Sequence, residues 1–174
     1  EINNCPNNKM KVGSYSDMTT FSFHPVKNMT TGEGGMITTN NESYYLKLKN
    51  FRSHGISIDY KQREKTASHY YEMTHLGYNY RICDILCGLG INQLKKLPDL
   101  IKRRQEIAKI YDKAFKELKE YITPLTNKFQ NAYHIYVIKL NLNNFKVDRD
   151  NIFKQLKKLK LGVNVHYLPI HLHP

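Results

Sequence analysis

The residue of this sequence best suited to chemistry is Lys27. It lies in "SFHPVKNMTTGEGG", residues 22–35, between a turn at Pro25 and a glycine-rich run whose backbone could approach a ligand closely. Ser22, five residues earlier, could direct its hydroxyl into the same cavity. A lysine with a hydroxyl and backbone amides nearby suits two kinds of chemistry. It could hold a phosphate as a point charge, or it could form a Schiff base with a carbonyl cofactor that carries a phosphate.

The surroundings of Lys27 favour the second interpretation. "TTGEGG" lacks the spacing of a P-loop, and no strand-to-helix turn follows it. The Schiff-base interpretation leaves Lys27 for the aldehyde and Ser22 for the phosphate. His24 could stack on the cofactor or hydrogen-bond near it, or it could pack within the turn. Glu33 could be satisfied by the loop backbone, or it could help to position Lys27.

Metal ligands are a second chemistry to consider. Of the three cysteines, Cys5 stands apart, and Cys83 and Cys87 are four residues apart in an expected helix. An odd number of cysteines indicates free thiols in a reducing compartment, although a metal-binding pair at Cys83 and Cys87 stays open. No nearby ligand completes that pair, and the spacing of His166, His171 and His173 fits no common zinc signature. We therefore expect no metal site.

The expected elements place Lys27 on a turn between two strands. "SYSDMTTFSF" (14–23) and "GGMITTN" (34–40) both have strand character. A helix is expected over residues 41–55, with Asn41 or Asn40 as its cap and Gly55 beyond its end. Residues 57–75 are polar and irregular, which predicts a long surface loop.

The rest of the chain alternates helices and strands. "ICDILCGLGINQLKKL" (82–97) predicts an apolar helix, and Pro98 is expected to open a second helix that runs to Tyr121. A strand over 132–140, a helix capped by Asp148 and ended by Gly162, and a strand over 163–169 follow. This order predicts an α/β fold in three parts: a large domain (1–97), a connecting helix (98–121) and a small α/β domain (122–174).

Composition limits the classes of function. The 174 residues carry a net charge of +12, but the lysines are spread along the chain and fall on the polar faces of expected helices. We therefore expect no nucleic-acid partner, although a basic surface would attract anionic small molecules. No apolar run approaches the roughly 20 residues that span a bilayer, and no secretory leader is evident, so the cytoplasm is the expected location.

With its neighbours, the lysine segment is similar to a known family. "SFHPVKNMTTGEGG" resembles the lysine segment of the pyridoxal-phosphate-dependent sugar aminotransferases, the DegT/DnrJ/EryC1/StrS family. The resemblance continues in order through "TTN", "FRSHGI", "LGYNYRICDI", "GLGINQLKKL", "RRQEIAKIYDKAF" and "VNVHYLPIHLHP". Within the family the chain looks most like the UDP-4-amino-4,6-dideoxy-N-acetyl-β-L-altrosamine transaminases of pseudaminic acid biosynthesis. The resemblance implies a fold-type I transferase that carries an amino group from L-glutamate to the C4 keto group of a UDP-4-keto-6-deoxy-N-acetyl-hexosamine.

The resemblance also implies roles for particular residues. Lys27 matches the lysine that forms the internal aldimine with pyridoxal phosphate and moves the proton, and Ser22 matches the hydroxyl that binds the cofactor phosphate. Asn79 matches an asparagine that reaches the partner's cofactor across a homodimer interface; without the resemblance it would be a turn residue after Gly77. The expected substrate-binding residues are Tyr80, His166 and Tyr167, and Arg81 could pair with a phosphate or support the interface.

Two parts of the family's machinery do not match any residue here. The phosphate-binding turn and the acidic residue at the pyridine nitrogen both lie upstream of the lysine in the family, and only 26 residues precede Lys27 in this sequence. We therefore expect the chain to be a fragment of a longer enzyme, inactive alone: the second half of the large domain and most of the small one. Two alternatives stay open: a family member that acts on another nucleotide-linked keto sugar, and a non-catalytic sensor or structural homologue. The presence of Lys27 argues against the second.

Overall fold

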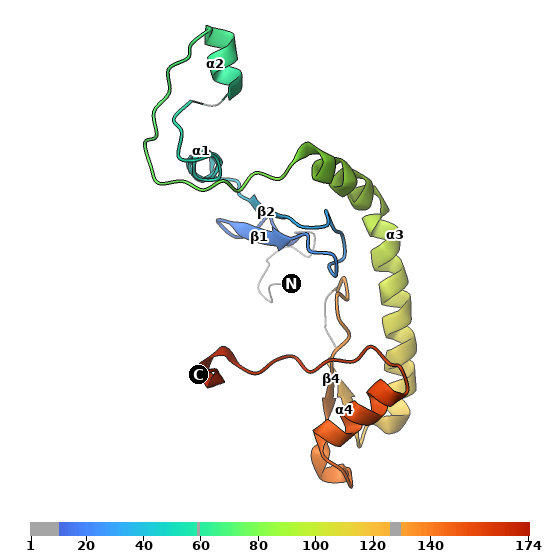
Figure 1. Ribbon diagram of the computed structural model, residues 1–174. Helices are drawn as coiled ribbons and strands as arrows, with labels where there is room; N and C mark the ends of the chain where they lie inside the picture. The colour runs from blue at the N-terminus through green and yellow to red at the C-terminus, as the bar shows by residue number, and fades with distance from the viewer. Residues whose placement is uncertain (1–10, 59, 126–129) are drawn as a thin grey trace. The chain divides into compact units, whose positions relative to one another are not determined.

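The computed structural model describes residues 11–58, 60–125 and 130–174 (Figure 1). The chain forms two compact units. The first contains Glu1–Arg104 and Phe129–His134, and the second contains Gln105–Lys128 and Ile135–Pro174. Among the helices in these described ranges, none is long and apolar enough to cross a membrane.

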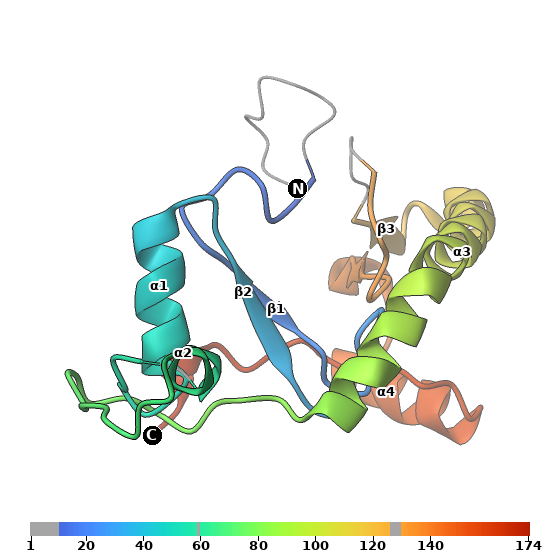
Figure 2. The same cartoon turned by 90° about the horizontal axis from the view of Figure 1, so that it is seen from above.

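The first unit contains the expected hairpin. Strands β1 (Thr19–Ser22) and β2 (Gly35–Thr38) pair antiparallel, with Thr19 opposite Thr38 and Ser22 opposite Gly35. Figure 2 shows the two strands side by side. The strands predicted over 14–23 and 34–40 are confirmed for residues 19–22 and 35–38 only, and residues 23–34, which include Lys27, form the loop that joins them.

Helix α1 (Glu42–Phe51) follows the hairpin and confirms the prediction made for residues 41–55. The side-chain oxygen of Asn41 accepts a hydrogen bond from the backbone N–H of Tyr44 at 3.1 Å, which satisfies one of the free donors of the first turn. Beyond the helix end, His54 and Gly55 both have positive φ, at 65° and 70°. Glycine is the natural residue for that conformation, so the chain turns away where the sequence indicates.

The loop predicted over residues 57–75 is partly helical. Helix α2 (Tyr60–Thr66) lies within it, so that part of the prediction is wrong. The sequence "YKQREKT" has no glycine or proline and is rich in Lys, Gln, Arg and Glu, which are good helix formers. The apolar periodicity that reveals a longer helix is absent from this stretch, which explains the error.

Helix α3 (Asp84–Phe115) is one helix of 32 residues with Pro98 inside it. The prediction that a first helix ends before Pro98 is therefore wrong. A proline removes the N–H bond to the carbonyl four residues earlier, and here that carbonyl belongs to Leu94, which like Pro98 lies on an exposed part of the helix, within reach of water. Figure 1 shows the ribbon changing direction within the green part of α3, as is usual for a proline-containing helix.

The second unit is built around a second small hairpin. Strands β3 (Ile122–Pro124) and β4 (Ile138–Leu140) pair antiparallel, with Ile122 opposite Leu140. Short 3₁₀ turns precede the hairpin at η1 (Lys116–Leu118), follow it at η2 (Leu142–Asn144) and lie near the end of the unit at η3 (Ile170–Leu172). The strand predicted over 132–140 is confirmed only for its last three residues, and β3 was not predicted.

Helix α4 (Arg149–Lys158) begins as predicted, because the Asp148 carboxylate accepts from the backbone N–H of Asn151 at 2.8 Å. It ends earlier than the predicted stop at Gly162, since Lys160 already takes a positive φ of 59°. The strand predicted over 163–169 is wrong: among the described residues this segment pairs with no other strand.

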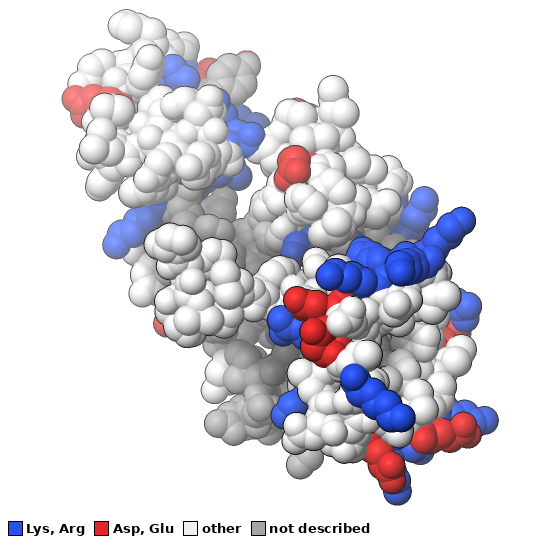
Figure 3. Space-filling view, turned by 60° about the horizontal axis from the view of Figure 1, so that its bottom comes forward, with Lys and Arg blue, Asp and Glu red and all other residues white. Residues whose placement is uncertain are grey.

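Fully buried side chains are few. In the described part of the chain, Ala108 of α3 is the buried apolar residue and Thr31 is the buried polar one, each 2% exposed. Large apolar side chains are exposed on both units, among them Leu76 and Ile85 at 84% and Ile170 at 90%. On the face drawn in Figure 3, lysine and arginine side chains stand in small groups with aspartate and glutamate among them. Because few described side chains are fully buried, hydrogen bonds and close backbone contacts determine much of the local arrangement of the chain.

Candidate active site

The loop that carries Lys27 is closed at its base by Phe23. The backbone N–H of Phe23 donates to the carbonyl of Gly34 at 2.8 Å, one step beyond the last pair of the hairpin. The Phe23 carbonyl accepts two bonds, from the N–H of Thr31 at 3.0 Å and from the hydroxyl of Thr30 at 2.9 Å. The start and the end of the loop are thus fixed to each other.

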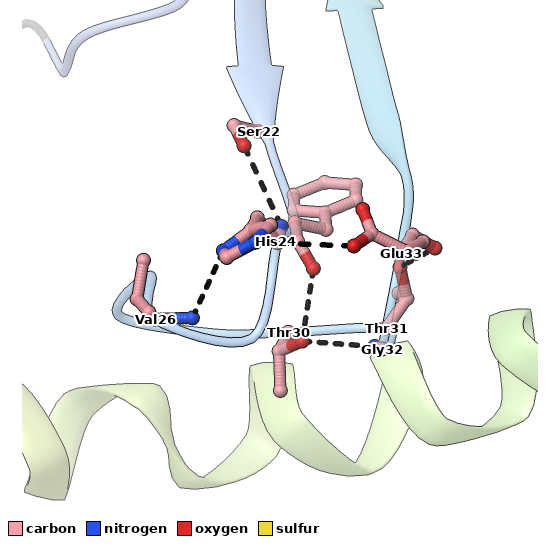
Figure 4. Close-up of polar contacts among 8 residues, drawn as sticks. Ser22, His24, Val26, Thr30, Thr31, Gly32 and Glu33 are labelled. Atoms are coloured by element: carbon pink, nitrogen blue, oxygen red, sulfur yellow. Dashed lines mark hydrogen bonds and ion pairs between the residues drawn. The ribbon is translucent and has the colours of Figure 1, made fainter.

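Two threonine hydroxyls order the second half of the loop, which leads into β2 (Figure 4). The Thr30 hydroxyl accepts from the backbone N–H of Gly32 at 2.8 Å while it donates to Phe23. The Thr31 hydroxyl donates to the carbonyl of Glu33 at 2.7 Å. The run "TTGEGG" (30–35) therefore holds its shape through its own hydroxyl groups, and Gly34 within it, at φ 157°, turns the chain into β2.

His24 organises the first half of the loop, which follows β1. Its carbonyl accepts from the backbone N–H of Lys27 at 3.0 Å, and its ring atom Nδ1 accepts from the N–H of Val26 at 3.3 Å. Because Nδ1 is an acceptor, the proton of the neutral ring is on Nε2, which lies 3.9 Å from Oε1 of Glu33. The Glu33 side chain is 78% exposed, so this pair contributes little energy but spans the loop. His24 thus makes the contacts of a residue packed within the turn, and its contact with a cofactor stays a prediction.

Ser22 and Lys27 lie five residues apart, at the end of β1 and in the loop that follows it. Ser22 ends β1 and is exposed, and among the described residues its Oγ has one long contact, from the N–H of His24 at 3.5 Å. Lys27 is half-buried. A hydroxyl with capacity for a further bond thus ends β1, and a half-buried amine follows in the loop.

The first part of α3 lies under the loop. A methyl group added to Gly34 would lie 3.0 Å from Cδ1 of Ile82, and one added to Gly32 would lie 3.9 Å from Cδ2 of Leu86. Ile82, just before the helix, and Leu86 in its first turn therefore both lie towards the glycines of the loop. Figure 4 shows the loop running above this helix.

Asn79 and Tyr80 lie in a segment that pairs with the end of α1. Ser53 and Asn79 form an isolated antiparallel bridge. The N–H of His54 donates to the carbonyl of Tyr78 at 2.9 Å, and the N–H of Tyr80 donates to Arg52 at 2.9 Å. "FRSHGI" and "LGYNYR", which are distant in sequence, are therefore neighbours in the first unit.

Both of these predicted site residues are exposed. Tyr80 is 71% exposed and stacks on Tyr78 at a ring-centroid distance of 4.6 Å. Tyr78 in turn contacts Phe51 at 5.8 Å. Tyr80 is thus the open end of a short column of rings, and the neighbouring side chain of Asn79 faces solvent as well.

His166 and Tyr167 belong to the second unit. Their rings stack at a centroid distance of 4.3 Å, and Tyr167 is 75% exposed. Within the described residues no group of three His, Cys, Asp or Glu side chains could hold a metal ion. Cys83 and Cys87 are free thiols, and Cys5 lies outside the described residues.

Sequence reasoning missed Asn28 and Thr31. The side-chain N–H of Asn28 donates to the carbonyl of Ala132 at 3.4 Å, and its Oδ1 is buried without a partner among the described atoms. This holds the residue after Lys27 against the segment 130–134. The Thr-Thr-Gly sequence was a usable signal for Thr31, because such hydroxyls bond locally in turns, but nothing in the sequence shows its burial.

Comparisons of sequence identify related proteins. A sequence profile described as the DegT/DnrJ/EryC1/StrS aminotransferase family matches residues 5–174. An uncharacterized protein of Methanocaldococcus jannaschii is 46% identical over 166 residues, which is 94% of this chain and 43% of that protein. A UDP-4-amino-4,6-dideoxy-N-acetyl-beta-L-altrosamine transaminase of Campylobacter jejuni is 41% identical over 162 residues, 92% of this chain and 41% of the enzyme. The chain thus spans about two fifths of the length of these relatives.

Solved structures show the same relationship. The Helicobacter pylori aminotransferase PseC, described as involved in the biosynthesis of pseudoaminic acid, superposes with a TM-score of 0.84 at 35% identity, over 96% of this chain and 43% of PseC. The pyridoxamine-phosphate (PMP) form of a putative sugar aminotransferase from Streptococcus pneumoniae superposes with a TM-score of 0.82 at 31% identity, over 95% of this chain and 43% of that one. The predicted fold, part of an aminotransferase, is confirmed.

Proposed function

Because this chain belongs to the DegT/DnrJ/EryC1/StrS aminotransferase family, we propose that it supplies the lysine-bearing part of a pyridoxal-phosphate-dependent sugar aminotransferase. The observation that carries the proposal is the half-buried Lys27 on a turn fixed at both ends, with the exposed hydroxyl of Ser22 at its base. The donor we propose is L-glutamate. The acceptor is the C4 keto group of a UDP-4-keto-6-deoxy-N-acetyl-hexosamine, in line with the name of the Campylobacter jejuni relative.

The residues present fit such a cofactor. A phosphate-bearing aldehyde needs an amine for its carbonyl carbon and donors for its phosphate. Lys27 offers the amine, and Ser22 offers a hydroxyl whose one contact within the described part of the chain is long, at 3.5 Å. When bound, pyridoxal phosphate supplies the electron sink that stabilises negative charge on the carbon losing its proton.

The chain's own residues then have distinct tasks. With the cofactor bound, the amine of Lys27 would hold its aldehyde carbon, and once released by the incoming amine Lys27 would carry a proton to and from the amino-bearing carbon. Ser22 donates its hydroxyl hydrogen to the phosphate and so orients the ring. We assign Asn79 to the phosphate of the cofactor of a second copy in a homodimer, since its side chain is exposed.

Three further residues are assigned to binding of the substrate. Tyr80, at the open end of its ring column, and the stacked pair His166 and Tyr167 are assigned to the nucleotide sugar. The net charge of +12 favours the approach of a diphosphate-bearing substrate. We place the reaction in the cytoplasm.

The test uses a full-length enzyme that carries this segment, purified with pyridoxal phosphate. Visible absorbance is recorded before and after addition of L-glutamate for the wild type, Lys27→Ala and the control Lys47→Ala, which removes an exposed lysine of α1. We expect a cofactor band that glutamate bleaches in the wild type and in the control, and no such band in Lys27→Ala. A bleachable band of full intensity in Lys27→Ala would contradict the role of Lys27.

Two further outcomes separate the alternatives. A wild-type protein with no cofactor band would keep the fold without the chemistry, and the sensor or structural role would replace the proposal. If the band is bleached by glutamate, a panel of UDP- and dTDP-linked keto sugars should restore it with the proper acceptor. Restoration by a dTDP-linked sugar alone would leave the aminotransferase assignment intact and correct the substrate.

A further inference from the structure

Thr31 is a buried polar residue that the proposed chemistry does not use. It is 2% exposed. Its backbone N–H donates to Phe23 and its hydroxyl donates to Glu33, at 3.0 and 2.7 Å. It therefore bonds both to the start of the lysine loop and to its end. One residue cross-links the turn that presents Lys27.

Two glycines make room for Thr31. A methyl group added to Gly34 would lie 2.4 Å from the Thr31 hydroxyl oxygen. One added to Gly90 of α3 would lie 2.9 Å from the Thr31 methyl carbon Cγ2. Gly88, two residues earlier on the same helix, would meet nothing within 4 Å. The missing side chain at Gly90 thus leaves a slot that the Thr31 methyl group occupies.

We propose that Thr31 is a positioning residue for Lys27, and that the slot at Gly90 sets how deeply the lysine loop seats on α3. This inference rests on the proposed function, because it assigns Thr31 a part in placing the reactive amine. The connection is short. Thr31 bonds to the carbonyl of Phe23, Phe23 is followed by His24, and the carbonyl of His24 holds the N–H of Lys27.

The expected size of the effect follows from the contact distance. An added methyl group at Gly90 must move from 2.9 Å to at least 3.4 Å from Cγ2 to reach an ordinary contact, a shift of about 0.5 Å. Reactive groups tolerate displacements of only about this size, and a displacement of 1 Å can cost about a hundredfold in rate. We therefore expect Gly90→Ala to slow the reaction with glutamate about tenfold.

The experiment combines four variants of the full-length enzyme loaded with pyridoxal phosphate: Gly90→Ala, Thr31→Ser, the double variant, and Gly88→Ala as the matched control. The first readout is the single-turnover rate at which glutamate bleaches the cofactor band. The second is the fraction of Lys27 that borohydride reduction leaves attached to the cofactor, measured by peptide mass. Serine keeps the hydroxyl but lacks Cγ2, so it removes the atom that the new methyl group would strike.

We expect Gly90→Ala to be slow, and the double variant to recover most of the wild-type rate. Gly88→Ala should behave as the wild type, and borohydride should still attach the cofactor to Lys27 in every variant. A wild-type rate in Gly90→Ala would overturn the proposal. So would a double variant no faster than Gly90→Ala, since the effect would then not pass through the Thr31 methyl group.

Two additions keep the test decisive. If Gly90→Ala does not fold, Thr31→Val keeps the methyl group but leaves the Glu33 carbonyl without its donor; a slow reaction is then expected, and a wild-type rate refutes the proposal. If the wild type has no cofactor band, the proposed function fails first. Hydrogen exchange at the backbone amides of Phe23 and Thr31 then tests the slot at Gly90 by itself. Faster exchange in Gly90→Ala than in Gly88→Ala supports the proposal that this slot positions the loop, and equal exchange in the two variants refutes it.

Discussion

The backbones of Gly55 and Gly77 pass very close to each other. This contact allows a test of how the segment that contains Asn79 is fixed against the end of α1. A methyl group added to Gly77 would lie 2.1 Å from the backbone nitrogen of Gly55 and 2.4 Å from the carbonyl carbon of His54. Both atoms belong to the backbone, so no side chain can swing aside. Gly77 does not have a left-handed φ, so the effect of Gly77→Ala is steric and not conformational.

The magnitude follows from the bonds that must lengthen. Relief to 3.4 Å needs a movement of about 1.3 Å between the two segments. Bonds from Tyr78 N–H to Phe51 at 2.6 Å and from His54 N–H to Tyr78 at 2.9 Å cross the same junction. Each backbone bond contributes about 0.5–1.5 kcal/mol net, and overpacking costs about 1–3 kcal/mol. We expect Gly77→Ala to lower local stability by about 2–4 kcal/mol.

The assay is amide hydrogen exchange at Tyr78 and Tyr80 in the full-length protein, with urea unfolding alongside. Gly162→Ala is the control, because a methyl group there meets nothing within 4 Å. Gly77→Ala should accelerate exchange at both tyrosine amides, while the control should not. Equal exchange in the two variants would show that the segments do not cross as closely as the structure has them.

Two smaller predictions concern single side chains. Asn41→Ala removes the cap of α1 and should lower unfolding stability by about 1 kcal/mol, whereas Asn41→Asp should be close to neutral; a neutral Asn41→Ala would contradict the capping bond. The hydrogen bond that Tyr70 donates to Glu72, and secondarily burial, raise the pKa of Tyr70 above its ordinary value of 10.0. The folded state therefore gains stability from this pair below the unfolded pKa and loses it as the pH rises through the folded pKa. Glu72→Gln should lower the pKa of Tyr70, as followed by phenolate absorbance against Tyr70→Phe.

The parts of the fold that sequence could predict are those with local signals. The hairpin around Lys27 follows from two short strand-like runs with a proline and glycines between them. Helix α1 follows from a cap at Asn41 and a glycine after its end, and both lie where expected. In each case the bonds that define the element join residues close in sequence.

The sequence-based predictions were wrong where solvent exposure or contacts with other segments determine the secondary structure. The rule that proline opens a helix is local, but at Pro98 both flanks are strong helix formers and the freed carbonyl of Leu94 is within reach of water, so α3 continues. The segment 163–169 has strand-like residues, yet a strand also needs a neighbouring backbone, which it lacks among the described residues. The bonding partners of a segment cannot be read from its own composition.

The candidate site divides in the same way. From spacing alone, Ser22 could be placed at the end of a strand and Lys27 on the turn that follows it. The burial of Thr31 and the slot at Gly90 could not, because 59 residues separate them and a glycine in a helix gives no sign of what it faces. The roles of Asn79, Tyr80, His166 and Tyr167 stay predictions.

One short stretch of chain links the close contact at Gly77 to the surface on which the lysine loop rests. Ile82 bears on Gly34 of the lysine loop, and Tyr80 is two residues before it, so their Cα atoms are at most about 7 Å apart. The segment that pairs with the end of α1 therefore runs almost directly into the surface on which the lysine loop rests. With Ala108 as the buried apolar side chain in the described part of the chain, little core packing is available to correct a displacement at either contact. An added methyl group at Gly77 or Gly90 should therefore shift the geometry of the site before it unfolds the chain, and cofactor chemistry should respond earlier than thermal stability.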